Sequence, residues 1–210
     1  TLETGNTDRT VTITSISGST TASGTYTVQT GDVSPDLTVS TIALSAGALS
    51  DAAGNAMSSF SIGTNLSTSS TIIIDGVLPT ISSVTSSTTD GIYNIGDILA
   101  ITVIFSETVT VTGTPQLTLE TGTTDAVVDY ASGSESTTLT FNYTVTAGAL
   151  SSDLDYGSTT ALALNSGTIA DSAGNVATLT LAAPGASNSL GANKALVVDG
   201  VVPTVSSITS

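Results

Sequence analysis

The sequence predicts an all-β protein built from antiparallel two-sheet β-sandwiches in tandem, and three observations predict it. Thr accounts for 41 of the 210 residues, and a stiff β-branched side chain suits the pleated, half-solvated face of a strand. Short segments of alternating apolar and polar residues recur between clusters of Gly, Ser, Asn and Asp, a pattern typical of strands separated by turns. The third observation is an internal repeat, which sets the size of the structural unit.

Long stretches of the sequence occur twice, about 120 residues apart. The opening TLETGNTD returns as TLETGTTD at 118–125, and DAAGN at 51–55 returns as DSAGN at 171–175. IIIDGVLPTISSVTS at 72–86 returns as LVVDGVVPTVSSITS at 196–210. The offset between the copies grows from 117 to 124 residues along the chain, which predicts small loop insertions in the second copy. Repetition of a unit this long indicates an array of similar domains.

We therefore expect one complete repeat at 79–199, preceded by the C-terminal part of a repeat at 1–78 and followed by the start of the next at 200–210. The joints Asp75–Pro79 and Asp199–Pro203 share the pattern Asp-Gly-Val-x-Pro. Proline fixes its own φ and is excluded from central strands, so each connector is short and stiffer than a Gly/Ser linker. The chain opens within a strand-like pattern and reads as a piece of a longer protein. The first repeat would then carry open sheet edges.

Seven strands are expected in the complete repeat, from period-2 alternation and from the turn residues between the segments. Gly113 and Pro115 predict a bulge in the third strand, and the DSAGN turn separates the last two. No helix is expected. Seven short strands in about 120 residues are typical of a two-sheet sandwich. In chain order the predicted strands are 80–87, 97–106, 108–121, 126–132, 137–146, 161–170, and a last strand that begins at 176 and finishes at 194–199.

The string YNIGDILAITVIFSETVTVTGTPQLTLETG at 93–122, followed by DSAGN and then by VVDGVVPT, resembles the bacterial immunoglobulin-like, cadherin-like repeats of large surface adhesins. The resemblance covers essentially the whole chain. It implies tandem immunoglobulin-like sandwiches that act as spacers, often stiffened by calcium, between a cell anchor and a distal binding domain. It also implies an extracellular location on the bacterial surface. Each joint here carries one Asp, whereas cadherin linkers carry several polar ligands.

Acidic residues distant in the sequence are predicted to form a calcium site where the chain enters the complete repeat. If consecutive antiparallel strands alternate in direction, the end of the second strand and the turn after the sixth lie at the same pole. This arrangement would bring Glu107 together with Asp171 and Asn175, and the incoming joint would add Asp75. Ca²⁺ takes carboxylate, amide and backbone oxygens, and Mg²⁺ is less suited because it dehydrates reluctantly. We therefore expect Ca²⁺ bound by Asp75, Glu107, Asp171 and Asn175.

A polar turn without metal is the alternative interpretation of DSAGN. Asp favours Asx turns, and Gly and Asn tolerate positive φ, while Glu107 could simply end a bend after its strand. The opposite pole is expected to hold a second acidic set of solvated loop residues near the outgoing Asp199: Asp90, Asp97, Asp153 and Asp155.

The composition excludes several classes of function. The sequence contains 17 acidic residues and only two basic ones, Arg9 and Lys194, for a net charge of −15. This charge disfavours nucleic acid and anionic membranes as partners and favours cations. Without Cys or His, the chain has no Cys/His metal site and none of the usual bases for a Ser or Thr nucleophile. A glycosidase-like carboxylate pair would lack the aromatic platforms for sugars. We expect no enzymatic activity, and no apolar run approaches the ~18 residues of a membrane span.

The remaining patterns have structural interpretations. The alternating Thr runs are read as ordinary solvated strand faces rather than an ice-binding surface. The sequons at Asn65 and Asn142 are read as chance matches. The larger aromatic side chains are expected to fill the core: Phe60, Phe105, Phe141, Tyr93, Tyr130 and Tyr143.

The predicted function is that of a structural spacer repeat in a secreted or cell-surface bacterial protein, an adhesin stalk with joints stiffened by calcium. Its partners would be neighbouring repeats of the same protein. Two alternatives remain open. The chain could be a subunit of a self-assembling extracellular filament, with other copies as partners, or an adhesive module that binds a glycan or another ligand.

Overall fold

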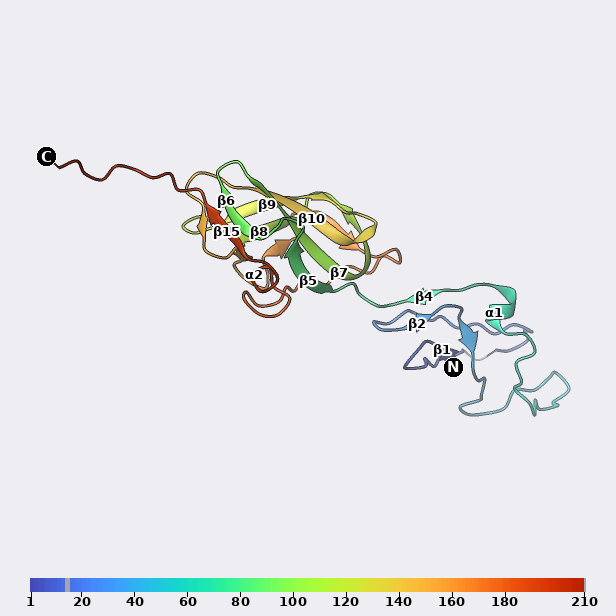
Figure 1. Cartoon of the computed structure of the whole chain (residues 1–210). Coiled ribbons are helices and arrows are strands. Elements are labelled where there is room, and N and C mark those ends of the chain that lie inside the picture. Colours follow the sequence, from blue (N-terminus) through green and yellow to red (C-terminus); the bar gives the residue numbers. More distant parts are fainter. Residues whose placement is uncertain (14–15, 210) are drawn as a thin grey trace. The chain divides into compact units, whose positions relative to one another are not determined.

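The structure, a computed structural model, describes residues 1–13 and 16–209 and divides into two units between Val77 and Leu78 (Figure 1). Regular structure in both units is almost entirely β-strand, so the predicted all-β class is confirmed. The first unit holds β1 (Leu2–Glu3), β2 (Val33–Ser34), β3 (Thr38–Val39), α1 (Leu66–Ser69) and β4 (Ile74–Asp75). The second holds β5 (Ile81–Ser86), β6 (Gly91–Asn94), β7 (Ile98–Thr112), β8 (Gln116–Glu120), β9 (Ala126–Ser132), β10 (Ser136–Thr144), β11 (Leu150–Ser151), β12 (Asp155–Tyr156), β13 (Leu162–Ala163), β14 (Thr168–Ala170), α2 (Leu190–Asn193) and β15 (Leu196–Asp199).

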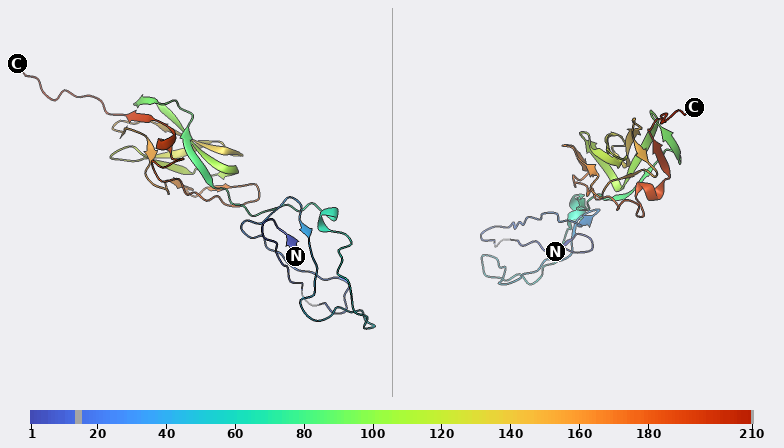
Figure 2. Two further views of the ribbon diagram at one scale, coloured as in Figure 1. Left: turned by 60° about the horizontal axis from the view of Figure 1, so that its bottom comes forward. Right: turned by 90° about the vertical axis from the view of Figure 1, so that its left-hand side faces the viewer.

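Two sheets form the second unit. The larger has the order β12-β8-β9-β10-β7-β14, with β13 added beside β8 and β5 beside β7, and its pairings are antiparallel. The smaller has the order β11-β15-β6, in which β15 and β6 are parallel. Figure 2 shows these strands curling around the interior of the unit. Residues 201–209 leave the end of β15 as an extended, exposed segment without strand pairing.

The core of the second unit is built on the alternation of its two longest strands. Every second residue of Leu99–Phe105 in β7 is at most 2% exposed, and every second residue of Leu139–Tyr143 in β10 is at most 3% exposed. The ring of Tyr130 meets that of Phe141 edge-on, with centroids 6.1 Å apart. Each fully buried apolar side chain contributes about 1.5–3 kcal/mol to folding. The expected burial of these β7 and β10 aromatics is confirmed.

The second and third predicted strands, 97–106 and 108–121, do not reverse at Glu107. The chain continues through Glu107 as the single strand β7, and the register with β10 shifts at this level. No Gly, Pro, Asn or Asp stands there, and the β-branched alternation of TVTVT favours extension. The reversal comes at Gly113, whose φ of +68° suits glycine.

The predicted strand 161–170 is interrupted by a tight turn. Asn165 and Ser166 have φ of +46° and +64°, so the chain folds back and forms β13 and β14 as separate strands. β14 is antiparallel to β7, with Ala170 opposite Thr110, and therefore runs opposite to the expected direction. Glu107 and Asp171 still come together despite these two wrong strand directions. β7 continues past Glu107, and β14 runs back along β7, so Asp171 after the end of β14 lies near Glu107.

Two one-turn helices occur in the described residues, so the expectation of no helix was wrong. Asn65 caps α1 by accepting from the backbone N–H of Leu66, and Ser189 caps α2 by accepting from that of Ala192. Both cap types are favoured at helix N-termini. The predicted strand at 176 is reduced to isolated bridges, after which α2 leads into β15.

The two units repeat the same local structure. The hydroxyl of Thr4 donates to the carbonyl of Thr7 at 2.8 Å, and that of Thr121 donates to the carbonyl of Thr124 at 2.8 Å. β1 pairs with β3 as β8 pairs with β12, and α1 and α2 start 124 residues apart. The sequence repeat therefore corresponds to a repeat of hydrogen bonds and elements.

The first unit buries far less apolar surface than the second. Among its described residues, the buried apolar side chains are Leu37 and Ile74, while Ile42, Leu44 and Met57 are more than 40% exposed. No described strand of this unit corresponds to β7. In the second unit, apolar side chains pack on β7. The corresponding side chains of the first unit have no such strand to pack on among the described residues.

Candidate metal centre

The turn Asp171–Asn175 is organised by its own carboxylate. One oxygen of Asp171 accepts the backbone N–H groups of Ala173 and Asn175, both at 2.8 Å, and the other accepts the side-chain amide of Asn175 at 2.7 Å. Gly174 supplies the positive φ, +92°, that closes the turn. Asp171 is only 6% exposed, so these bonds satisfy a buried charge.

The same arrangement stands in the first unit. Asp51 accepts the N–H groups of Ala53 and Asn55 at 3.0 and 2.9 Å, and the amide of Asn55 at 2.8 Å. Gly54 has a φ of +90°. The recurrence of Asp-x-Ala-Gly-Asn therefore has a sufficient structural cause in the turn itself, which supports the polar-turn interpretation.

The turn also keeps the Asp171 carboxylate ionised. Burial raises the pKa of Asp171, but hydrogen bonds from the side chain and backbone of Asn175 and from the N–H groups of Ala173 and Gly174 outweigh it, and the pKa is lowered. At neutral pH the group carries a negative charge in a buried position. A nearby cation would be attracted to it.

Glu107 is the second acid that the fold brings to this place. The β14–β7 ladder sets Ala170 opposite Thr110, and carboxylate oxygens of Asp171 and half-buried Glu107 lie within 4.8 Å of each other. The sequence analysis predicted this pairing of Glu107 with Asp171, although the strand directions on which it relied were wrong. Two carboxylates at this separation repel each other, and a shared cation relieves such repulsion.

Asp75 ends β4 of the first unit, where it is half-buried and accepts the N–H of Val77 at 3.1 Å. The second unit begins by fixing Thr80 to β7, because Thr80 N–H donates to the hydroxyl of Ser106 at 3.0 Å and Ser106 N–H donates to the carbonyl of Thr80 at 2.8 Å. Ser106 precedes Glu107 in the chain. The role of Asp75 as a ligand stays a prediction.

The donor set fits a hard cation. Carboxylate and amide oxygens are ligands that Ca²⁺ accepts, in a shell of 6–8 oxygens completed by backbone carbonyls and water. Asp171 already accepts three hydrogen bonds, which occupy most of its acceptor positions. Asn175 turns its amide nitrogen towards Asp171, so its side-chain oxygen is the atom that a cation would take.

Acidic residues predicted at the opposite pole form an ion pair or accept backbone hydrogen bonds. Asp90 forms an ion pair with Lys194 at 2.9 Å, Asp97 accepts the N–H of Asn94 at 2.8 Å, and Asp155 accepts that of Gly185 at 2.9 Å. Within residues 1–13 and 16–209, no three of the acids predicted there bring their ligand atoms within 4.8 Å of one another.

The sequence analysis missed a buried charged network in the first unit. Asp32, 1% exposed, accepts Arg9 Nε at 2.8 Å, the backbone N–H of Gln29 at 2.9 Å and the hydroxyl of Tyr26. The second copy has Ala at the positions of both Arg9 and Asp32, so comparing the two copies would have revealed the pair. Since Arg9 and Lys194 are both in ion pairs, neither is available as part of a basic surface for phosphates.

Comparisons with protein-family models, with curated proteins and with solved structures found no significant match. Among the described residues, both helices are too short and too polar to cross a membrane.

Proposed function

We propose that this chain is a structural segment of a tandem array of immunoglobulin-like β-sandwich repeats, which extends and spaces a secreted or surface-attached bacterial protein. It has no catalytic role, and neighbouring repeats of the same protein are its partners. The observation that carries the proposal is the recurrence of one set of hydrogen bonds at both joints, Asp75–Val77 and Asp199–Val201.

At each joint, backbone hydrogen bonds hold the glycine of the Asp-Gly pair against a loop of the same unit. Gly31 N–H donates to the carbonyl of Gly76 and Gly76 N–H donates to that of Asp32, both at 2.7 Å. At the second joint, Gly148 N–H donates to the carbonyl of Gly200 at 2.8 Å, and Gly200 N–H donates to that of Ala149 at 2.7 Å. These bonds fix the point at which the chain leaves each unit and shorten the free connector, a property that suits a spacer.

The joint glycines leave no room for a side chain. A Cβ on Gly76 would lie 2.3 Å from the carbonyl oxygen of Gln29, and a Cβ on Gly200 would lie 2.2 Å from that of Thr146. Asp75 and Asp199 each accept the N–H two residues later at 3.1 Å. The Asp-Gly pattern of the joints therefore has a mechanical basis in both units.

Calcium bound by Asp75, Glu107, Asp171 and Asn175 would stiffen the first of these joints. Pro79 follows Asp75 by four residues, and an extended chain advances at most about 3.6 Å per residue, so Asp75 is tethered to the point where the second unit starts. The cation would offset the repulsion between the acids and reduce the freedom of the linker.

The test is thermal unfolding of the whole chain in millimolar CaCl₂ and in EDTA, with Glu107→Gln as the matched variant. Calcium should raise the Tm of the wild type, since a ligand that binds the folded state stabilises it, and E107Q should lose most of the rise. Asp199→Asn, at the other joint, serves as the control that retains the rise. An unchanged Tm in the wild type would remove calcium from the proposal and leave the spacer function to be tested on its own.

A self-assembling filament subunit is the second candidate. The exposed apolar side chains of the first unit, among them Ile42, Leu44 and Met57, favour it because exposed apolar surface promotes association. Light scattering after size-exclusion chromatography separates the two candidates. A monodisperse monomer over a hundredfold range of concentration supports the spacer, and growing rods or fibres support the filament.

A further inference from the structure

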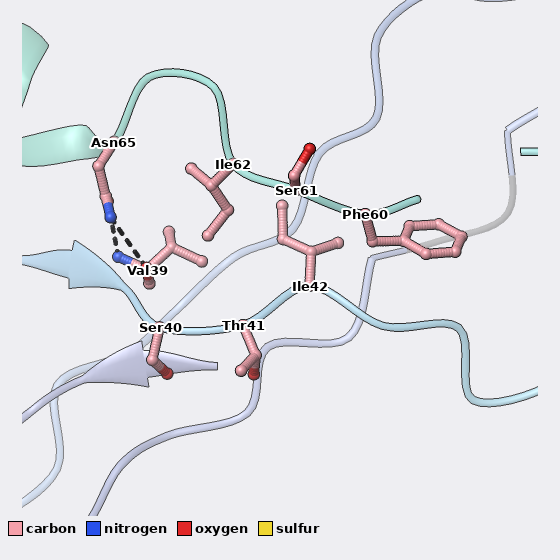
Figure 3. A pocket seen from close by; sticks show the side chains of 8 residues that line it. All are labelled: Val39, Ser40, Thr41, Ile42, Phe60, Ser61, Ile62 and Asn65. Atoms are coloured by element: carbon pink, nitrogen blue, oxygen red, sulfur yellow. Dashed lines mark hydrogen bonds between the residues drawn. The ribbon is translucent and has the colours of Figure 1, made fainter. Parts of the chain in front are cut away.

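The first unit contains an open cavity of about 400 Å³ between the segment that follows β3 and the segment that leads into α1. Figure 3 shows the side chains of Ile42 and Ile62 entering the space between these segments, with Val39 at one end and Phe60 at the other. Phe60, expected to fill the core, instead lines this cavity. The lining residues are Val39, Ser40, Thr41, Ile42, Phe60, Ser61, Ile62 and Asn65.

The repeat identifies what occupies the same place in the second unit. Val39 of β3 pairs with Leu2 of β1, and Tyr156 of β12 pairs with Leu119 of β8. These pairings are equivalent under the 117-residue offset between the copies. Val39 therefore stands where the second unit has Tyr156, and the first unit lacks that phenol ring.

The phenol ring of Tyr156 is enclosed by the protein and its hydroxyl is hydrogen-bonded, as expected for a bound phenol. Its side chain is 1% exposed, and its hydroxyl donates to the carbonyl of Ala182 at 2.8 Å. Burial raises the pKa of Tyr156 to about 12, with a further contribution from the Asp155 carboxylate, so the hydroxyl keeps its proton. Ala182 lies between the DSAGN turn, whose offset from DAAGN is 120, and α2, whose offset from α1 is 124, so its counterpart falls within residues 58–62, a segment that lines the cavity of the first unit.

One wall of the cavity is held in place by a polar side chain. The side chain of Asn65 accepts the N–H of Val39 at 2.8 Å and donates to its carbonyl at 2.9 Å (Figure 3). These two bonds fix the backbone from which the missing ring would project. The cavity is open, and the side chains of Val, Ile and Phe line it together with those of Ser, Thr and Asn, so a small ligand would find apolar contacts and polar groups side by side.

We propose that this cavity binds a small free phenol, whose ring takes the place that the ring of Tyr156 takes in the second unit. Ile42 and Ile62 supply the apolar contacts, and a backbone carbonyl of the segment 58–62 accepts the phenol hydroxyl. The site goes beyond the spacer function and does not depend on calcium, because it rests on the equivalence of Val39 and Tyr156.

The probe is p-cresol, which is the side chain of tyrosine as a free molecule, titrated into the whole chain and followed by amide chemical shifts. Saturable shifts are expected at Val39, Ile42 and Ile62. Toluene, which has the same shape without the hydroxyl, should bind about three- to tenfold more weakly, since a hydrogen bond contributes about 0.5–1.5 kcal/mol. Equal binding of toluene would overturn the hydroxyl contact, and the absence of saturable shifts would overturn the site.

Val39→Tyr is the matched control, because it places a ring in the cavity from within the chain. V39Y should abolish the p-cresol shifts and raise the Tm of the first unit. Unchanged shifts in V39Y would place p-cresol elsewhere and contradict the proposal. Tyr156→Val should have the opposite effect in the second unit, where p-cresol should raise the lowered Tm, and a Y156V chain that stays unfolded with p-cresol present would count against the equivalence.

Discussion

At the scale of single residues, the short turn motif owes its recurrence to one carboxylate. Asp171 orders five residues of backbone by accepting two N–H groups and one amide. Asp51 makes the same bonds in an exposed turn. The motif was readable as a turn from residue types alone, since Asp, Gly and Asn favour it. The closeness of Glu107 to Asp171 is a separate property, which comes from the sheet.

The first prediction compares the two turns. Asp171→Ala should lower the free energy of unfolding of the second unit by at least about 2 kcal/mol, because three hydrogen bonds to a charged group are lost, each contributing about 1.5–3 kcal/mol before water replaces part of them. Asp51→Ala should cost its own unit clearly less, because the turn is exposed and water replaces the carboxylate there. Urea unfolding followed by NMR resolves the two units. Equal losses would show that burial does not set the strength of this turn.

The second prediction concerns the pH dependence of the first unit. The hydrogen bond from Arg9, with those from Tyr26 and Gln29, lowers the pKa of Asp32 to about 2 against the opposing effect of burial. A group with a lowered folded-state pKa contributes stability above its unfolded pKa of about 3.9, and this stability is lost as the pH falls from about 4 to 2.

The measurement is the stability of the first unit between pH 2 and 6, by amide exchange of residues in β2 and β4. The wild type should lose stability steeply below pH 4. Asp32→Asn should be less stable at neutral pH and should lack this part of the acid dependence, since it no longer titrates. A wild-type profile that is flat from pH 4 to 2 would refute the assignment.

At the scale of elements, turns decided where the sequence analysis succeeded and where it failed. The alternation of β7 and β10 was readable, and the interior side chains fell where period 2 places them. The turn at Asn165–Gly167 was predicted to be part of a continuous strand, although Asn, Ser and Gly are turn residues. The reversal expected at Glu107 was placed in a β-branched run that has no reason to turn. Element type follows from local alternation, but strand direction depends on every turn before it.

The third prediction tests this turn through Gly167. A Cβ at Gly167 would lie 2.3 Å from the backbone carbonyl oxygen of Thr112, so Gly167→Ala should push β14 away from β7. The expected loss is about 1–3 kcal/mol, the usual cost of overpacking, measured by urea unfolding. Gly157→Ala is the control, because its nearest contacts are at 3.9 Å and its effect should be small. Equal effects of the two variants would contradict the close approach of β14 to β7.

At the scale of the whole molecule, one repeat contains a full core and the other contains few buried apolar residues. The core cluster of the second unit joins residues from Val84 to Val198, whereas Leu37 and Ile74 are the buried apolar side chains among the described residues of the first. Apolar burial is the main favourable term in folding. The two units should therefore differ in stability despite their related sequences.

The fourth prediction is that amide hydrogen exchange separates the units. Amides of β7 and β10 should exchange through global opening of the second unit, whereas those of β2 and β4 should exchange at least about a hundredfold faster through an opening that leaves the second unit folded. Mass spectrometry of exchanged peptides measures both in one sample. Uniform protection across residues 1–199 would contradict this difference.

Taken by itself, the sequence determined the all-β class, the repeat and its offsets, the short Asp-Gly joints and the turn chemistry of Asp171. These features depend on residue type and on spacing along the chain, so they can be read locally. Only the tertiary structure decided that β7 runs through Glu107, that β14 returns to meet it, that Asp32 pairs with Arg9, and that Val39 leaves a cavity where Tyr156 fills one. These features depend on which distant segments pack together, and that choice minimises the free energy of the whole unit rather than of any single stretch.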